Sequence, residues 1–135
     1  MKLKAFAIAA LLMAPPPFAV AQQADARAAA GNKIFDWCKR LPTGTVAECS
    51  CVAGFYAGVT EDDEFQLIAV VVDYITADGE ISDIPAMQAS VSAHQVAVGM
   101  TTERLQELAT RFGNFAAIGE KADSICVPVK DHAGQ

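Results

Sequence analysis

The 135-residue sequence predicts an all-α protein, a small bundle of about five helices that disulfides link together. Apolar residues recur at spacings of three and four in successive segments. Residues that begin or end helices separate these segments, and no two alternating segments could pair as a sheet. Four cysteines in a chain with an export signal add the expectation of two structural disulfides.

Residues 1–21 form a predicted signal peptide that is removed on export. Two lysines precede an apolar run of about ten residues, roughly half the length of a bilayer-spanning helix. Three prolines and a small-x-small pattern ending at Ala21 follow this run. Gln22 stands where a lipoprotein would have its cysteine. We therefore expect cleavage after Ala21 and a periplasmic or secreted product without a membrane anchor.

The product, residues 22–135, is long enough for a single helical domain with one core. Loss of the two leader lysines leaves eight basic and sixteen acidic side chains, a net charge of about −8 with both histidines neutral. This charge repels phosphate backbones and anionic lipids. Neither nucleic acid nor a membrane surface is therefore an expected partner.

The first predicted helix begins near Asp25 and ends before Pro42. Thr45 and Glu48 then fit a capping box, in which each side chain accepts a hydrogen bond from the other residue's backbone N–H. This pattern predicts a second helix that continues to about Gly58.

Thr60 and the four acidic residues after it predict a third helix over residues 61–77, because negative charge is favourable at a helix N-terminus. Segment 67–72 within it is apolar on every side and rich in β-branched residues, so it could also be a buried strand. We favour a helix because no partner strand exists elsewhere. A helix that is apolar all round belongs at the centre of a bundle.

The fourth predicted helix begins at Ser82 or Asp83 and ends at Gly99. Its apolar stripe is expected to face the core and comprises Ile84, Met87, Val91 and Val98. The fifth begins at Thr101 or Thr102 and keeps one apolar face for about six turns, until Pro128.

Aromatic residues at helical spacing most simply belong to the core, although some of them could line a groove for an apolar ligand or a partner helix. They are Phe35, Trp37, Phe55, Tyr56, Phe112 and Phe115.

The four cysteines are expected to form two bridges that leave the second helix in different directions. Cys38 and Cys49 face each other across a short turn between two helices. Cys51 is about 200° further around the helix and can meet Cys126 at the end of the last one. The favoured pairing is thus Cys38–Cys49 with Cys51–Cys126, and the alternative is Cys38–Cys51 with Cys49–Cys126. A bridge between Cys49 and Cys51 would distort the helix.

A thiol-based function is the alternative to two structural bridges. Cys49 and Cys51 could act as a redox dithiol, or hold copper or zinc with help from His94 or His132. However, no Cys-x-x-Cys motif precedes a βαβ pattern, and both histidines lie far along the chain. We therefore expect no cofactor. His94, beside the apolar stripe of the fourth helix, could instead sense pH.

An Asp-Gly-x-Ile-Ser segment between the third and fourth helices resembles the middle of an EF-hand calcium loop. The resemblance implies a loop over residues 74–85 with Asp78, Glu80 and Ser82 at ligand positions. The ends of that loop hold tyrosine and proline in place of the first Asp and the last, bidentate Glu. The alternative is a turn followed by a helix cap. Weak calcium binding is thus a second alternative function.

No catalytic set is visible, because no serine stands in a Gly-x-Ser-x-Gly setting and helix capping explains most carboxylates. The sequence therefore predicts a small exported protein that acts by binding, or by protecting against stress, rather than by catalysis. Its expected partner is another periplasmic protein or a small apolar ligand. An enzyme whose site assembles from scattered residues stays an alternative.

Overall fold

The computed structural model describes residues 17–112 and 115–126, and these ranges are helical apart from their loops. One 3₁₀ turn, η1 (Val72–Tyr74), extends the third of six α-helices. The described ranges contain no β-strand, and one isolated β-bridge pairs Ile75 with Ile81. The all-α prediction is confirmed, with six helices where about five were expected. In chain order they are α1 (Pro17–Arg40), α2 (Val46–Val59), α3 (Asp62–Val71), α4 (Ile84–Val98), α5 (Thr102–Phe112) and α6 (Phe115–Cys126).

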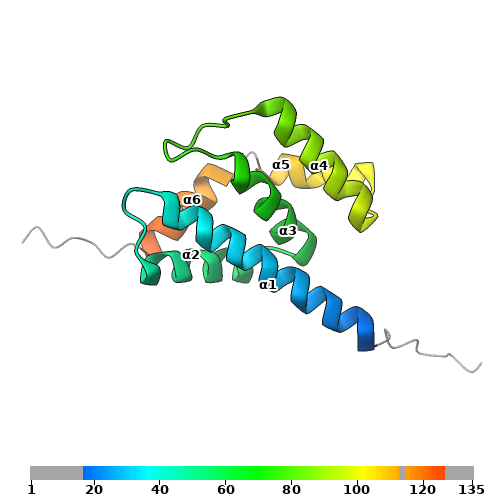
Figure 1. Ribbon diagram of the computed structural model, residues 1–135, viewed down its shortest axis with the longest axis horizontal. Helices are drawn as coiled ribbons and strands as arrows, with labels where there is room; N and C mark the ends of the chain where they lie inside the picture. Colours follow the sequence, from blue (N-terminus) through cyan, green and yellow to red (C-terminus); the bar gives the residue numbers. More distant parts are fainter. Residues whose placement is uncertain (1–16, 113–114, 127–135) are drawn as a thin grey trace, which may run out of the picture.

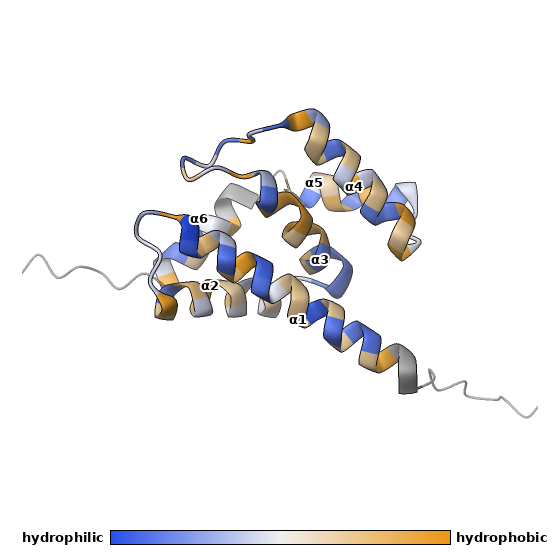
Figure 2. Cartoon of the chain, viewed as in Figure 1, coloured by the Kyte–Doolittle hydropathy of each residue, from blue (hydrophilic) through white to orange (hydrophobic). Residues whose placement is uncertain are grey.

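Helix α3 lies at the centre of the fold, with α1 and α2 on one side and α4 and α5 on the other (Figure 1). Segment 67–72, which could have been a strand, is helical through Val71 and then tightens into η1. The second half of α3 is the apolar centre of the molecule (Figure 2). Segment 67–72 is therefore apolar on every side because it lies at the centre of the fold, as the sequence predicts.

The main core lies between α1, α2 and α3. Ile34, Tyr56 and Phe65, one from each helix, are at most 2% exposed. Burial of a side chain of this size contributes about 1.5–3 kcal/mol. Four of the other predicted core aromatics are half-buried around this centre: Phe35, Trp37, Phe55 and Phe112. The side chain of Phe115 lies outside the described residues.

Local capping signals give several helix ends correctly. The Glu48 N–H donates to Thr45 Oγ1 (3.2 Å) and the Thr45 N–H donates to the Glu48 carboxylate (3.0 Å), which is the predicted capping box. Asp83 Oδ1 accepts from the Ala86 N–H (2.9 Å) and begins α4. Gly99 ends α4 with a left-handed φ of 66°, a conformation that glycine adopts without steric cost.

Helix α1 begins at Pro17 rather than near Asp25, because proline is favourable in the first turn of a helix and alanine-rich sequence then continues it. The predicted cleavage after Ala21 therefore falls inside α1, whose first part projects beyond the other helices (Figure 1). Among the described side chains of α1, the first buried one is Ala30. Cleavage stays a prediction, and it would leave the buried core intact.

The predicted start of α3 also needs correction. Glu61, not Thr60, is the residue before the first turn, and its N–H donates to the Glu64 carboxylate (3.4 Å). The Thr60 hydroxyl donates instead to the Tyr56 carbonyl (2.7 Å) and so closes the end of α2.

The long fifth helix of the prediction is two helices, because α5 ends at Phe112 and α6 begins at Phe115. The apolar spacing continues across the break, which is why periodicity alone misses it. Glycine and asparagine, the two residues between these helices, are poor helix formers and lie outside the described residues. The start of α5 is as predicted, with the Arg104 N–H donating to Thr101 Oγ1 (3.1 Å).

Two disulfides join three helices. Cys38–Cys49 connects the end of α1 to α2, with a Cα–Cα distance of 5.4 Å. Cys51–Cys126 connects α2 to the end of α6, at 5.5 Å. This is the pairing that the sequence favours, because Cys49 and Cys51 lie on different sides of α2 and meet different neighbours. No described helix is both long and apolar enough to cross a membrane.

Candidate functional site

Helix α4 departs most clearly from the packing that the sequence predicts. Its apolar stripe should face the core, yet none of the residues of α4, all of which are described, is buried. Ile84 is 53% exposed and Val98 46% exposed, while Met87 and Val91 are half-buried. The prediction of a buried stripe is therefore wrong, since these residues face an open space and the solvent rather than the core.

An open cleft of about 370 Å³ lies between α3, α4 and α5. Its size falls within the range of small-molecule sites, about 300–1,000 Å³. Every residue that lines it is apolar or glycine, so a molecule held there would be bound by burial and dispersion rather than by hydrogen bonds. We call it the apolar cleft, and it is lined by Leu67, Val71, Ile75, Gly79, Ile81, Met87, Val91, Leu105, Ala109 and Phe112.

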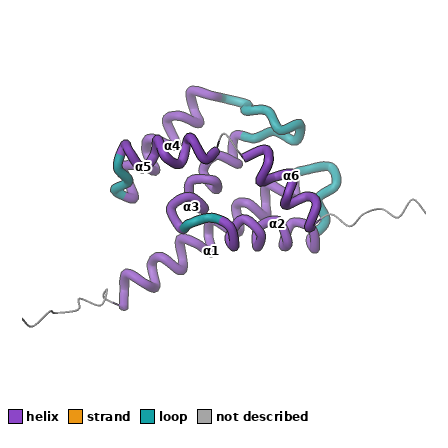
Figure 3. The backbone as a smooth tube through the Cα atoms, turned by 180° about the vertical axis from the view of Figure 1, so that it is seen from behind, coloured by secondary structure: helices purple, strands orange, loops and turns teal. Residues whose placement is uncertain are grey.

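The loop between η1 and α4, drawn in teal in Figure 3, forms one end of the apolar cleft. Ile75 and Ile81 face each other across an antiparallel bridge. The Thr76 N–H donates to the Glu80 carbonyl (2.9 Å), and Gly79 turns the chain at a φ of 81°. Only glycine adopts this φ readily, so the turn depends on it.

This loop also carries the residues that resemble an EF-hand, and backbone hydrogen bonds close it. Asp78 and Glu80 are exposed, and the Ser82 hydroxyl donates to the Tyr74 carbonyl (3.0 Å). In the described part of the chain, no group of three or more His, Cys, Asp or Glu side chains could hold a metal ion. The loop therefore fits the alternative interpretation, a turn followed by a capped helix.

The cysteines named for the thiol-based alternative belong to different bridges. Cys49 is fully buried and paired with Cys38, and Cys51 is half-buried and paired with Cys126. Thiolates that could bind copper or zinc would exist only after reduction. His132, one of the two proposed helpers, lies outside the described residues.

His94, the other helper, lies on α4 beside the start of α3. It lines a polar pocket that also contains Asp62, Asp63 and Arg104. Burial lowers the pKa of His94, and the positive charge of Lys33 lowers it further. The imidazole is therefore neutral at neutral pH, and both its burial and the charge of Lys33 oppose its protonation.

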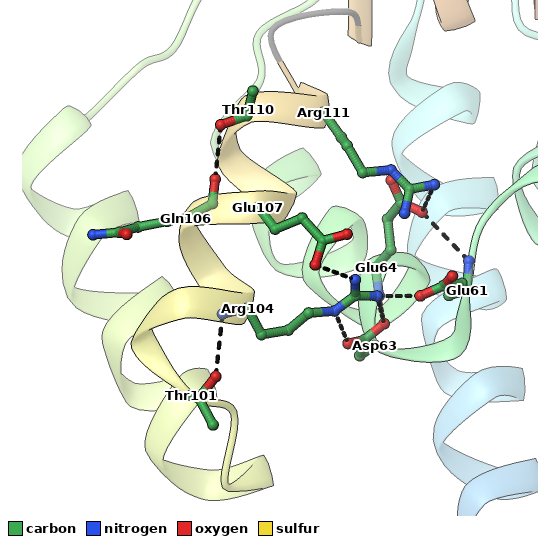
Figure 4. Close-up of polar contacts among 9 residues, drawn as sticks. All are labelled: Glu61, Asp63, Glu64, Thr101, Arg104, Gln106, Glu107, Thr110 and Arg111. Atoms are coloured by element: carbon green, nitrogen blue, oxygen red, sulfur yellow. Dashed lines mark hydrogen bonds and ion pairs between the residues drawn. The ribbon is translucent and has the colours of Figure 1, made fainter.

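Charged residues hold α5 against the start of α3. Arg104 donates to both carboxylate oxygens of Asp63 (2.7 and 2.9 Å) and to Glu107 (2.8 Å), and it also pairs with Glu61 (Figure 4). The hydrogen bond from Arg104 lowers the pKa of Asp63, although partial burial opposes this effect. In the same way, the hydrogen bond to Asp63 raises the pKa of Arg104. Such two-pronged contacts fix geometry as well as charge.

A second arginine completes the contact one to two turns further along α5. Arg111 pairs with Glu64 (3.2 Å), whose side chain is only 5% exposed, so the pair neutralises a buried carboxylate. Leu108, on the same face between the two arginines, is fully buried. We call the charged residues the ion-pair cluster: Glu61, Asp63, Glu64, Arg104, Glu107 and Arg111. Because Leu105, Ala109 and Phe112 belong to α5, the cluster joins this wall of the apolar cleft to the start of α3.

Sequence reasoning missed the ion-pair cluster and did not locate the apolar cleft, although it named Phe112 among the aromatic residues that could line a groove. The two arginines are seven residues apart, which places them on one face of a helix, and four acids stand together at residues 61–64. The sequence contains both the arginines and the acids, but only the tertiary fold shows that they contact each other.

Comparison of the chain with protein families, with curated proteins and with solved structures finds no match.

Proposed function

We propose that the protein is an exported, non-enzymatic binding module that holds a small apolar ligand in the apolar cleft. The composition of the cleft carries this proposal. Ten residues from α3, the following loop, α4 and α5 line an open space without contributing one polar side chain. Folded proteins usually cover so continuous an apolar surface unless it serves a ligand or a partner.

Export is part of the proposal. The predicted leader ending at Ala21 supports it, and two disulfides are typical of proteins in an oxidising compartment. The bridges lie away from the apolar cleft and fix α1, α2 and α6 to one another. This arrangement gives a rigid base for the helices that line the cleft.

The expected affinity is moderate. Burial of about 200 Å² of apolar ligand surface contributes about 5 kcal/mol at roughly 25 cal/mol per Å². Loss of translational and rotational freedom offsets part of this gain. A ligand whose shape matches the cleft would bind more tightly, because the side chains of the lining offer no hydrogen bonds.

The test uses N-phenyl-1-naphthylamine, an uncharged probe whose fluorescence rises in apolar surroundings. We expect the oxidised protein to bind it saturably. Val91→Gln places an amide in the apolar cleft and should weaken binding about tenfold, since desolvation of an unpaired amide costs about 1–3 kcal/mol. Val96→Gln is the matched control on the same helix, because Val96 is 82% exposed and does not line the cleft.

Equal binding by both variants would contradict the proposal, as would an absence of saturable binding by the wild type. Circular dichroism of each variant checks that the helices are retained.

A further inference from the structure

A second cleft, of about 380 Å³, lies between α1, α2 and α6. Trp37, which is half-buried, and Glu48 and Asp123 are among the residues that line it, and the buried Tyr56 lies at its base. We call it the aromatic cleft. It is separated from the apolar cleft by the 75–81 loop, two residues of which line both.

The charge around the aromatic cleft is negative. Glu48 stands in the first turn of α2, Asp123 lies on α6, and the whole chain has a net charge of −6. Burial, and then the negative charge of Asp123, raise the pKa of Tyr56 to about 12. The phenol is therefore neutral, and the negative potential of Asp123 reaches into the cleft.

The positive charge of Lys39 opposes this potential. The Lys39 ammonium donates to the Gly44 carbonyl (3.0 Å), and Gly44 also lines the aromatic cleft. Because Lys39 is exposed, its effect can be tested without a change to the core.

The tryptophan restricts the kind of ligand. Its Nε1 is buried without a hydrogen-bond partner in the described part of the chain, so the N–H is not accessible to a molecule in the cleft. Recognition must therefore use the accessible part of the Trp37 ring and the negative charges of Glu48 and Asp123, because Tyr56 is only 2% exposed. Rings attract cations through their electron-rich faces, most strongly in the case of tryptophan, and the carboxylates add Coulomb attraction.

We propose that the aromatic cleft binds an organic cation with an apolar body, such as a quaternary ammonium ion or an aromatic amine. The apolar part of the wall, which includes Leu41, Val52 and Ala122, requires the apolar body. A small hydrated metal cation would find too few ligands there, since no group of three or more His, Cys, Asp or Glu side chains among the described residues could hold one, and an anion would be repelled. This site is independent of the proposed function of the apolar cleft.

The test titrates the full oxidised protein with benzyltrimethylammonium, which keeps its charge at every pH. Trp37 is the single tryptophan of the chain, so its fluorescence reports on this cleft, and calorimetry gives an independent binding constant. Benzyldimethylamine N-oxide, of similar shape and no net charge, and phenylmethanesulfonate, an anion, are the matched ligands. We expect the cation to bind at least tenfold more tightly than either.

Substitutions locate the site. Asp123→Asn and Glu48→Gln should each weaken cation binding about threefold, the scale of a partly solvated charge contact. Glutamine preserves the capping box, so Glu48→Gln changes the charge more than the fold. Lys39→Gln should strengthen binding. Glu120→Gln is the control, an exposed acid on α6 that does not line the cleft, and it should change nothing.

Three outcomes would overturn the proposal: equal binding of the three ligands, equal weakening by Glu120→Gln and Asp123→Asn, or no saturable binding at millimolar concentration. Weaker cation binding that is confined to the Asp123→Asn and Glu48→Gln variants would support it.

Discussion

The two disulfides should contribute unequally to stability. They are compared by replacing each pair with alanine, as Cys51→Ala with Cys126→Ala and as Cys38→Ala with Cys49→Ala. A bridge stabilises a protein mainly by restricting the unfolded chain, and the effect grows with the length of the loop that it closes. The cysteines are 75 residues apart in the first pair and 11 apart in the second.

The chain-entropy relation converts these separations into about 4.5 kcal/mol for Cys51–Cys126 and about 2.8 kcal/mol for Cys38–Cys49. Cys38 and Cys49 are both buried, at 4% and 0% exposed, whereas Cys126 is buried at 8% and its partner Cys51 is half-buried, so truncation of Cys38 and Cys49 leaves somewhat more unfilled space. This cavity term reduces the expected difference to about 1 kcal/mol. The variant without Cys51–Cys126 should still be the less stable.

Equilibrium unfolding in urea measures both free energies. The variant without Cys51–Cys126 should also have the larger m-value, because its unfolded chain is less restricted and exposes more surface. The reasoning would be refuted if the variant without Cys38–Cys49 had the lower free energy of unfolding at an unchanged m-value.

Three further predictions concern helix packing, pH and capping. Arg104→Gln should increase hydrogen–deuterium exchange at the amides of α5 while exchange in α2 stays unchanged, because Arg104 joins α5 to α3. Asp63 and His94 both have pKa values below their ordinary ones, so each favours the fold above its unfolded pKa and this contribution is lost as the pH falls through the folded pKa. The free energy of unfolding should thus fall in two steps as the pH decreases, the first below the ordinary histidine pKa of 6.5 for His94 and the second below the ordinary aspartate pKa of 3.8 for Asp63. Asp63→Asn should remove the lower step, and a profile unaffected by that substitution would contradict this assignment. Thr45→Ala should cost about 1 kcal/mol by loss of the capping box, visible as a lower Tm, and an unchanged Tm would show that the cap adds nothing.

Local chemistry made much of the fold predictable. A cap is formed by residues within one turn of each other, so Thr45, Asp83 and Gly99 could be recognised from their neighbours. The disulfide pairing followed from the same kind of argument, because residues two positions apart face different sides of a helix. The apolar run 67–72 was ambiguous locally and was decided by the absence of a partner strand.

The parts that could not be predicted depend on contacts between distant segments. Periodicity shows that α4 has an apolar stripe but not whether another helix covers it, so Met87 and Val91 were assigned to the core. Likewise, two arginines on one helix face do not reveal the acidic helix start that they meet. Both clefts arise from how helices are spaced, which no local pattern records.

The most direct test of the central claim, that the apolar cleft binds an apolar ligand, uses methionine methyl groups. Met87 lines the apolar cleft, whereas Met100 lines the polar pocket beside His94. In protein labelled with ¹³C at the methionine methyls, an aromatic probe bound in the cleft shifts nearby methyl resonances through its ring current. On titration with N-phenyl-1-naphthylamine we expect the Met87 methyl signal to shift saturably and the Met100 signal to stay in place. Saturable probe binding that shifts Met100 and leaves Met87 unchanged would contradict the claim.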